Sequence, residues 1–322
     1  VPVAGGLVVG AIVQFLLPQK RPQGVADVIE ASALKGGWMS SRTGLVAALG
    51  SAISIGAGAS VGREGPAVHL GASLAGWIGR RLHLSRSLTR TLLGCGVAAA
   101  VAASFNAPIA GALFASEVVI GHYALRAFAP IVIASVAGTA VSGAFFGDFP
   151  AFALADTPLA SFWEFPAFVG LGIIAGITAI AFMHSIFSVQ QLAAKTPLPA
   201  WLRPAVGGLM VGLIGLAFPE VMGVGYGLTE NALIFNISLS MLVVLCIAKI
   251  AATAVSIGWG FCGGVFSPSL VIGALLGGAW GVIFTSLFPE YSSGPAAYTL
   301  VGMGAMTAAV LGAPISTTLI IF

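Results

Sequence analysis

Long apolar runs follow one another along almost the whole chain, and only short polar stretches separate them. Several runs are shorter than the roughly 20 residues that a transmembrane helix needs, and 44 glycines and 17 prolines interrupt the sequence. Non-helical backbone is tolerated at membrane depth only where it is buried in protein or lines a cavity. The pattern therefore predicts tilted, broken and re-entrant helices. The runs cover about residues 2–17, 42–61, 66–82, 88–104, 106–122, 127–147, 162–194, 204–218, 232–258, 264–288, 297–312 and 314 onward.

The composition supports a membrane location. Of the 322 residues, 58% are hydrophobic and 7% are charged, and the mean hydropathy is +1.05. Because soluble domains carry roughly a quarter charged residues, we predict a polytopic membrane protein whose partner is the lipid bilayer. The net charge of +3 is too small to indicate a nucleic-acid partner.

No residue pattern indicates a metal, a cofactor or an enzyme. The three cysteines lie far apart in apolar runs, and the four histidines lack the spacing of metal ligands. The sequence contains neither a zinc-protease motif nor a recognisable nucleophile beside a base. We therefore expect a protein that is not an enzyme and has no cofactor.

Three short elements occur twice, in the same order, which indicates an internal duplication. We expect a first half at residues 1–160 and a second at 161–322, with a site between them, because paired interrupted helices in two halves point to such a site. The chain begins and ends inside apolar runs, so we expect a fragment that lacks both ends of its protein. The matching pairs are GREGP at 62–66 with GVFSP at 264–268, GCGVAAA at 94–100 with GMGAMTA at 302–308, and NAPI at 106–109 with GAPI at 312–315.

The GREGP element combines a helix start with a charged side chain. Pro66 suits the first turn of a helix, where its missing N–H has no intrahelical partner. The flanking glycines leave backbone amides uncovered, and the positive end of a helix dipole favours an anion. Glu64 adds a tethered anion at this place. Ionisable residues inside a membrane are costly and indicate a functional site. The alternative is a turn at the membrane interface, in which both charges of the motif are solvated.

These motifs and their order resemble the CLC family of chloride channels and transporters. The resemblance covers nearly the whole chain and implies an all-α polytopic membrane protein, built as a CLC-type inverted repeat of broken, tilted helices. It also implies a homodimer with a separate pore in each subunit. Chloride would be the permeant ligand and would bind where helix N-termini converge. We further expect an integral protein of a bacterial-type plasma (inner) membrane.

The same resemblance implies roles for individual residues. Glu64 would be the gating glutamate, whose carboxylate competes with chloride. The amides of Val265 and Phe266 would line a central anion site, and the backbone amides of Arg63 and Gly65 would serve an outer site. The family's pore-lining tyrosine would lie beyond Phe322.

The first anion-binding loop departs from the family pattern. The family usually has GSGIP, whereas residues 22–26 here read PQGVA. Gln23 replaces the serine, and its side-chain amide can still donate a hydrogen bond to an anion beside Gly24. The preferred anion therefore stays open.

A second departure bears on proton coupling. Proton-coupled members usually carry a glutamate directly after the position of Glu117, and this chain has Val118, which cannot carry a proton. This favours a voltage-gated chloride channel-like function. A proton-coupled chloride antiporter and a secondary transporter of another anion are the alternatives. Glu117 is either a second carboxylate on a proton path or a structural, hydrogen-bonded residue.

Two further features, residues 224–227 and Lys249, indicate a function less clearly. Residues 224–227, VGYG, resemble part of a potassium filter but lack its threonine, and we interpret them as a glycine loop between helices. Lys249 lies in an apolar run, and we expect it either to reach the membrane surface or to pair with a carboxylate, with a direct role in the pore as the alternative.

Overall fold

The computed structural model describes residues 1–147, 160–234 and 237–322, and their regular structure is helical. A π-helical turn, η1 (Ala115–Ile120), continues α6, and short 3-10 turns are η2 (Phe162–Glu164), η3 (Ala200–Leu202), η4 (Pro219–Val221) and η5 (Pro289–Tyr291). The α-helices are α1 (Pro2–Leu16), α2 (Val25–Leu34), α3 (Ser41–Gly56), α4 (Glu64–Arg81), α5 (Arg86–Phe105), α6 (Pro108–Phe114), α7 (Leu125–Phe146), α8 (Phe165–Lys195), α9 (Arg203–Ala217), α10 (Tyr226–Leu233), α11 (Leu239–Gly258), α12 (Phe266–Leu287), α13 (Pro295–Leu311) and α14 (Pro314–Ile321).

Six helical segments of the described residues are long and apolar enough to cross a membrane. Others, such as α1 and α13, are apolar but shorter. This mixture is what the interrupted apolar runs predict. The six segments are Arg86–Phe105, Leu125–Phe146, Phe162–Lys195, Ala200–Ala217, Leu239–Gly258 and Phe266–Leu287.

The repeated sequence elements form corresponding structures. Pro66 and Pro268 lie in the first turns of α4 and α12. After α5 the chain turns through Asn106 in the left-handed conformation (φ 54°), and after α13 it turns through Gly312 (φ 65°). In each case an X–Pro helix start follows, at α6 and α14. The same local chemistry therefore breaks the backbone at matching places.

The repeated glycines explain how the helices of each pair pack. Gly71 of α4 faces the carbonyl oxygen of Gly96 in α5, and Gly273 of α12 faces that of Gly302 in α13. A Cβ atom on Gly71 or Gly273 would collide with the facing carbonyl oxygen. The glycine five residues after each motif proline therefore permits close helix packing.

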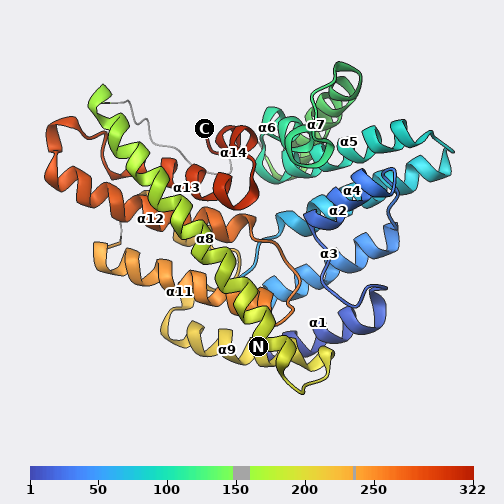
Figure 1. Cartoon of the computed structure of the whole chain (residues 1–322), viewed down its shortest axis with the longest axis horizontal. Helices are drawn as coiled ribbons and strands as arrows, with labels where there is room; N and C mark the ends of the chain where they lie inside the picture. The colour runs from blue at the N-terminus through green and yellow to red at the C-terminus, as the bar shows by residue number, and fades with distance from the viewer. Residues whose placement is uncertain (148–159, 235–236) are drawn as a thin grey trace.

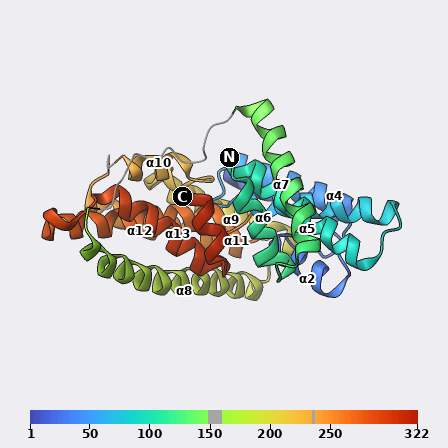
Figure 2. The same ribbon diagram turned by 90° about the horizontal axis from the view of Figure 1, so that it is seen from above.

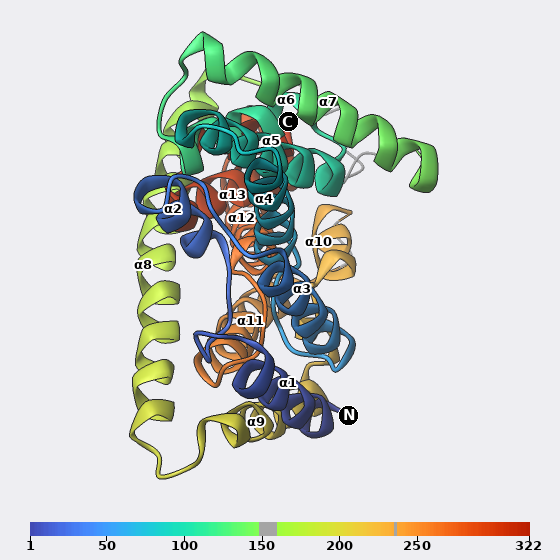
Figure 3. The same ribbon diagram turned by 90° about the vertical axis from the view of Figure 1, so that its right-hand side faces the viewer.

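The two helix pairs extend from the centre of the molecule in opposite directions. In Figure 1, α4 and α5 run to one side while α12 and α13 run to the other. The long helix α8 lies along one face, as Figure 2 and Figure 3 show from two further directions.

Aromatic contacts join the two halves in the core. The ring of Phe266 lies 5.0 Å from that of Phe105 and 6.3 Å from that of Phe114. The division at residue 160 stays a prediction.

Candidate functional site

The starts of α4 and α12 meet at the centre of the molecule. The amide of Gly62 donates to the carbonyl oxygen of Gly264 at 2.8 Å, and the amide of Gly264 donates to Gly62 at the same distance. A Cβ atom on Gly264 would lie only 3.2 Å from the nitrogen of Gly65. Glycine at this position therefore allows two helix N-termini, one from each repeat, to approach each other, and their dipoles favour negative charge between them.

Glu64 places its carboxylate at this junction and is 3% exposed. Its Oε1 accepts hydrogen bonds from the hydroxyl of Ser267 at 2.6 Å and from that of Tyr226 at 2.9 Å. Within the described part of the chain, its other oxygen, Oε2, is buried and has no hydrogen-bond partner. The carboxylate thus occupies a position that suits an anion, although one oxygen is not satisfied there.

Two cavities lie next to this junction. The first has a volume of about 520 Å³ and is lined by the predicted gate and by most of the predicted anion-binding residues. Arg63 is the predicted anion-binding residue that does not line it. The second, of about 1060 Å³, is lined by Arg63 and Tyr226 among others. Phe105 borders both cavities. The predicted residues around the first cavity are Gln23, Gly24, Glu64, Gly65, Val265 and Phe266.

The side chain of Arg63 lies toward the second cavity. Its guanidinium is 5.2 Å from the centre of the Tyr226 ring, and its Nε is 3.8 Å from Oε1 of Glu64. It also donates to the carbonyl oxygen of Ser104 at 3.4 Å. The predicted contact of Arg63 with the anion concerns its backbone amide, and that role stays a prediction.

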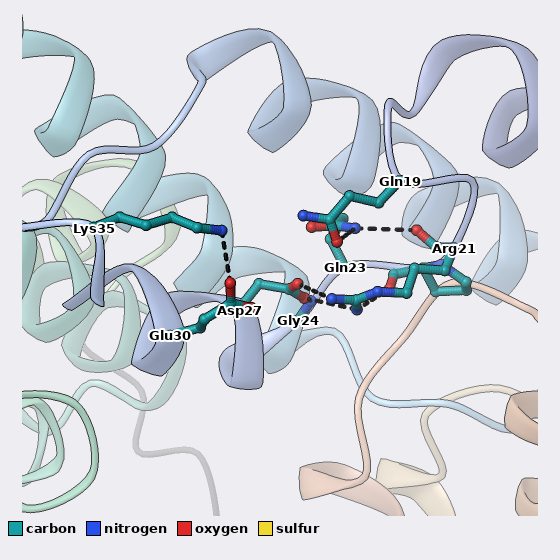
Figure 4. A network of polar contacts seen from close by, with 8 residues as sticks. Gln19, Arg21, Gln23, Gly24, Asp27, Glu30 and Lys35 are labelled. Carbon is teal, nitrogen blue, oxygen red and sulfur yellow. Dashed lines mark hydrogen bonds and ion pairs between the residues drawn. The ribbon is translucent and has the colours of Figure 1, made fainter. Parts of the chain in front are cut away.

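In the loop before α2, the hydrogen-bond donors of Gln23 and Gly24 bind to neighbouring residues of the same segment (Figure 4). The side-chain nitrogen of Gln23 donates to Gln19 and to the carbonyl oxygen of Arg21, each at 3.2 Å. The amide of Gly24 donates to Asp27 at 2.9 Å, and Asp27 forms an ion pair of 2.6 Å with Arg21. Gln23 and Gly24 therefore line the first cavity with donors that are already engaged, and an anion would have to compete for them.

Glu117 is a hydrogen-bonded residue, which is one of the two alternatives that the sequence left open for it. Its two oxygens accept the backbone amides of Ile315 at 3.1 Å and Ser316 at 2.8 Å. It therefore caps the N-terminus of α14, where four amides lack intrahelical partners. Val118 beside it is half-buried and packs against the apolar core. Neither residue is among those that line the two cavities.

Ser267 and Tyr226 contact Glu64 but were not predicted as site residues, and Lys249 lies nearby. Ser267 belongs to the GVFSP motif, and its place in this repeated helix start could have indicated that it lies close to Glu64. Tyr226 was interpreted as part of a glycine loop at 224–227, which was wrong for its second half, because α10 begins at Tyr226. The sequence carries no local pattern that joins Tyr226 to Glu64. The ammonium of Lys249 is fully buried and contacts backbone carbonyl oxygens. Among the described residues it therefore neither reaches the surface nor pairs with a carboxylate, and both of these expectations were wrong.

Comparison with known proteins decides the family. The family described as "Voltage gated chloride channel" matches residues 5–322. The chain belongs to this family. It is 37% identical over 326 residues to a ClcB-like protein of Ralstonia nicotianae, covering 100% of this chain and 76% of that protein. It is 33% identical over 273 residues to the H(+)/Cl(-) exchange transporter ClcA of Yersinia pestis, covering 82% of this chain and 56% of the transporter.

The fold of this CLC chain also matches solved structures. A slow cyanobacterial Cl-/H+ antiporter superposes with a TM-score of 0.90 at 24% identity, covering 99% of this chain and 76% of the antiporter. The predicted all-helical CLC membrane fold is confirmed. Because the family consists of channels and transporters, the prediction that the chain is not an enzyme is also confirmed.

Proposed function

We propose that this CLC protein conducts chloride across a membrane along a path between the two cavities, with Glu64 as its gate. The observation that carries the proposal is the buried carboxylate of Glu64 at the meeting point of α4 and α12. Glu64 borders the first cavity, and its hydrogen-bond partner Tyr226 borders the second. A charged group held at this junction blocks the place that a chloride ion would occupy.

The surroundings suit a permeant anion. Chloride in a dry site loses its hydration, which is costly, and helix N-termini and hydroxyl groups offset that cost without a full positive charge. A lysine in direct contact could bind the ion too tightly for conduction, because the ion must also leave. Lys20 and Arg203 instead lie among the residues around the first cavity, where positive charge raises the local anion concentration. Arg21 also lines this cavity, but its charge is paired with Asp27.

The proposed gate responds to protons and to chloride. A charged Glu64 accepts the two hydroxyl hydrogen bonds and competes with chloride for the helix N-termini. A protonated Glu64 loses the electrostatic attraction to these N-termini. Acid pH and high chloride concentration therefore both favour the open state.

We propose that conduction is passive, as in a channel. Val118 cannot carry a proton, and both oxygens of the neighbouring Glu117 are bound to α14. The alternative, proton-coupled exchange, is favoured by the 33% identity to ClcA, which is named as an exchange transporter. A secondary transporter of an organic anion would need a wider passage than a monatomic ion requires.

The deciding experiment is reconstitution of the full-length protein with an imposed chloride gradient. The voltage at zero current is recorded at two pH gradients. A passive channel gives a voltage that follows the chloride gradient and ignores the pH gradient. A voltage that shifts with the pH gradient would contradict the channel and support exchange. The homodimer and the bacterial-type plasma membrane stay predictions from the resemblance.

A further inference from the structure

We propose that Tyr226 is a second determinant of the gate, which holds Glu64 in the closed position, and that Lys249 is the positioning residue for Tyr226. This inference rests on the proposed function and extends it to residues outside the repeated motifs. Tyr226 is the first residue of α10, and its hydroxyl donates to Glu64 Oε1 at 2.9 Å.

The hydroxyl of Tyr226 distinguishes the two protonation states of Glu64. Oε1 accepts two hydrogen bonds, one from Ser267 and one from Tyr226. Hydrogen bonds to an ionised acceptor are about twice as strong as neutral ones. The pair of hydroxyls therefore stabilises the charged, closed state more than the protonated one. Tyr226 thereby affects how readily acid opens the gate.

The position of Tyr226 depends on a tightly held loop at residues 221–225. Gly225 directly before it has a φ of +95°, a left-handed conformation that favours glycine. A Cβ atom on Gly225 would lie 2.9 Å from a methyl carbon of Val271 and 3.1 Å from Nζ of Lys249. The loop therefore has little room to move while α11 and α12 stay in place.

Lys249 of α11 holds this loop by its carbonyl oxygens. Its ammonium donates to Val221 at 2.9 Å and to Gly223 at 3.0 Å, and a third carbonyl, that of Val224, lies at 3.5 Å. The side chain is fully buried. A buried ammonium has three N–H groups to satisfy, and the loop supplies three carbonyl oxygens. Breaking these bonds would leave polar groups unpaired in the interior, which is costly.

Arg63 supports the same position from the side of the second cavity. Its guanidinium lies 5.2 Å from the centre of the Tyr226 ring, within the range of a cation–π contact. Tyr226 is thus held by its ring, by its hydroxyl and by the loop before it. Its hydroxyl is the group that contacts the gate directly, whereas Lys249 acts on the gate only through the loop.

The first test is Tyr226→Phe in the full-length protein reconstituted in liposomes. This variant keeps the ring contact with Arg63 and removes the hydroxyl. We expect chloride efflux at neutral pH to rise about tenfold, the effect of losing one hydrogen bond to a charged acceptor. Efflux at acid pH should change little, because the gate is already open there. Tyr291→Phe, an exposed tyrosine in η5, is the matched control and should behave as the wild type.

A double variant separates the gate from general damage. In the Glu64→Gln background, Tyr226→Phe should add nothing, because the uncharged side chain has already left the closed position. The proposal is overturned if Tyr226→Phe leaves neutral efflux at the wild-type level, or if it raises efflux equally with Glu64 and with Gln at position 64. Efflux that responds to Glu64→Gln but not to Tyr226→Phe refutes only the role of Tyr226. The absence of efflux from both the wild type and Glu64→Gln would instead refute the proposed function.

Lys249→Met tests the positioning role, because methionine is similar in length and has no donor. We expect the same rise at neutral pH and the same reduced ratio of acid to neutral efflux as in Tyr226→Phe, with no further rise when both are combined. Gly225→Ala displaces the same loop and serves if Lys249→Met does not fold. If the folded Lys249→Met or Gly225→Ala variant keeps the wild-type ratio of efflux at acid pH to efflux at neutral pH, the positioning role is overturned.

Discussion

Glu64 and Glu117 both lie against the N-terminus of a helix from the other half of the chain, and they are bound in different ways. Glu117 receives two backbone amides of α14, one on each oxygen. Glu64 receives two side-chain hydroxyls on one oxygen, while the other has no partner among the described residues. A backbone amide cannot turn away without unwinding its helix, whereas a hydroxyl can rotate. The comparison indicates that Glu117 is a fixed cap and that Glu64 is able to leave.

The largest expected effect comes from Glu64→Gln. The variant removes the charge that holds the side chain over the two helix starts. The neutral amide oxygen of glutamine weakens both hydroxyl hydrogen bonds and loses the attraction to the helix N-termini. Together these losses correspond to a rise in neutral-pH chloride efflux of about a hundredfold, and the response to acid should disappear. Efflux from liposomes at neutral and acid pH measures both. Glu290→Gln on the exposed turn η5 is the control. Efflux that stays strictly acid-gated in Glu64→Gln would refute the gate.

Ser267→Ala should have the next largest effect. It removes the 2.6 Å hydrogen bond to Glu64 and leaves that of Tyr226. We expect a rise of about tenfold in neutral-pH efflux, with acid activation reduced but present. Ser269→Ala is a matched control, because its buried hydroxyl donates to the carbonyl oxygen of Phe266 in the same helix turn. Equal effects of the two variants would show that packing of α12, and not the bond to Glu64, is responsible.

Glu117→Ala tests the other side of the comparison. Loss of the cap on α14 should lower the free energy of unfolding by about 1–2 kcal/mol. The ratio of chloride efflux at acid pH to that at neutral pH should stay at the wild-type value. Denaturant unfolding in detergent measures the first quantity, and the liposome assay measures the second. A variant of unchanged stability that loses its acid response would place Glu117 on a proton path instead.

Val118→Glu should have the smallest effect on chloride flux. The new carboxylate supplies the proton acceptor that the family's coupled members usually have here, while the gate is untouched. We expect flux to continue and the voltage at zero current to become sensitive to the pH gradient. Loss of flux would indicate that Val118 supports the packing of the path itself.

Local chemistry explains why much of the site could be predicted from the sequence. The helix starts at 62–66 and 264–268 depend on glycine and proline, whose backbone preferences are visible in any short stretch. Glu64 stands out because a charged residue in an apolar region is costly. The engaged amide of Gly24 was also open to prediction, since Asp27 lies three residues after Gly24, the spacing of a helix capping box.

Contacts between distant segments could not be predicted in this way. Tyr226 and Glu64 are 162 positions apart, and a hydrogen bond between two side chains leaves no pattern around either residue. The partners of Lys249 are carbonyl oxygens, which every residue carries, so no sequence feature marks them. Such contacts become visible only when the fold brings α10 and α11 next to the start of α4.

The most direct test of the account is anomalous diffraction from crystals grown in bromide, for the wild type and Glu64→Gln. At neutral pH the wild type should keep the Glu64 carboxylate on the hydroxyls of Ser267 and Tyr226, with no bromide in that place. The variant should bind bromide there, close to the starts of α4 and α12. An empty junction in the variant, or bromide beside an undisturbed carboxylate in the wild type, would contradict the claim that Glu64 occupies the anion's position.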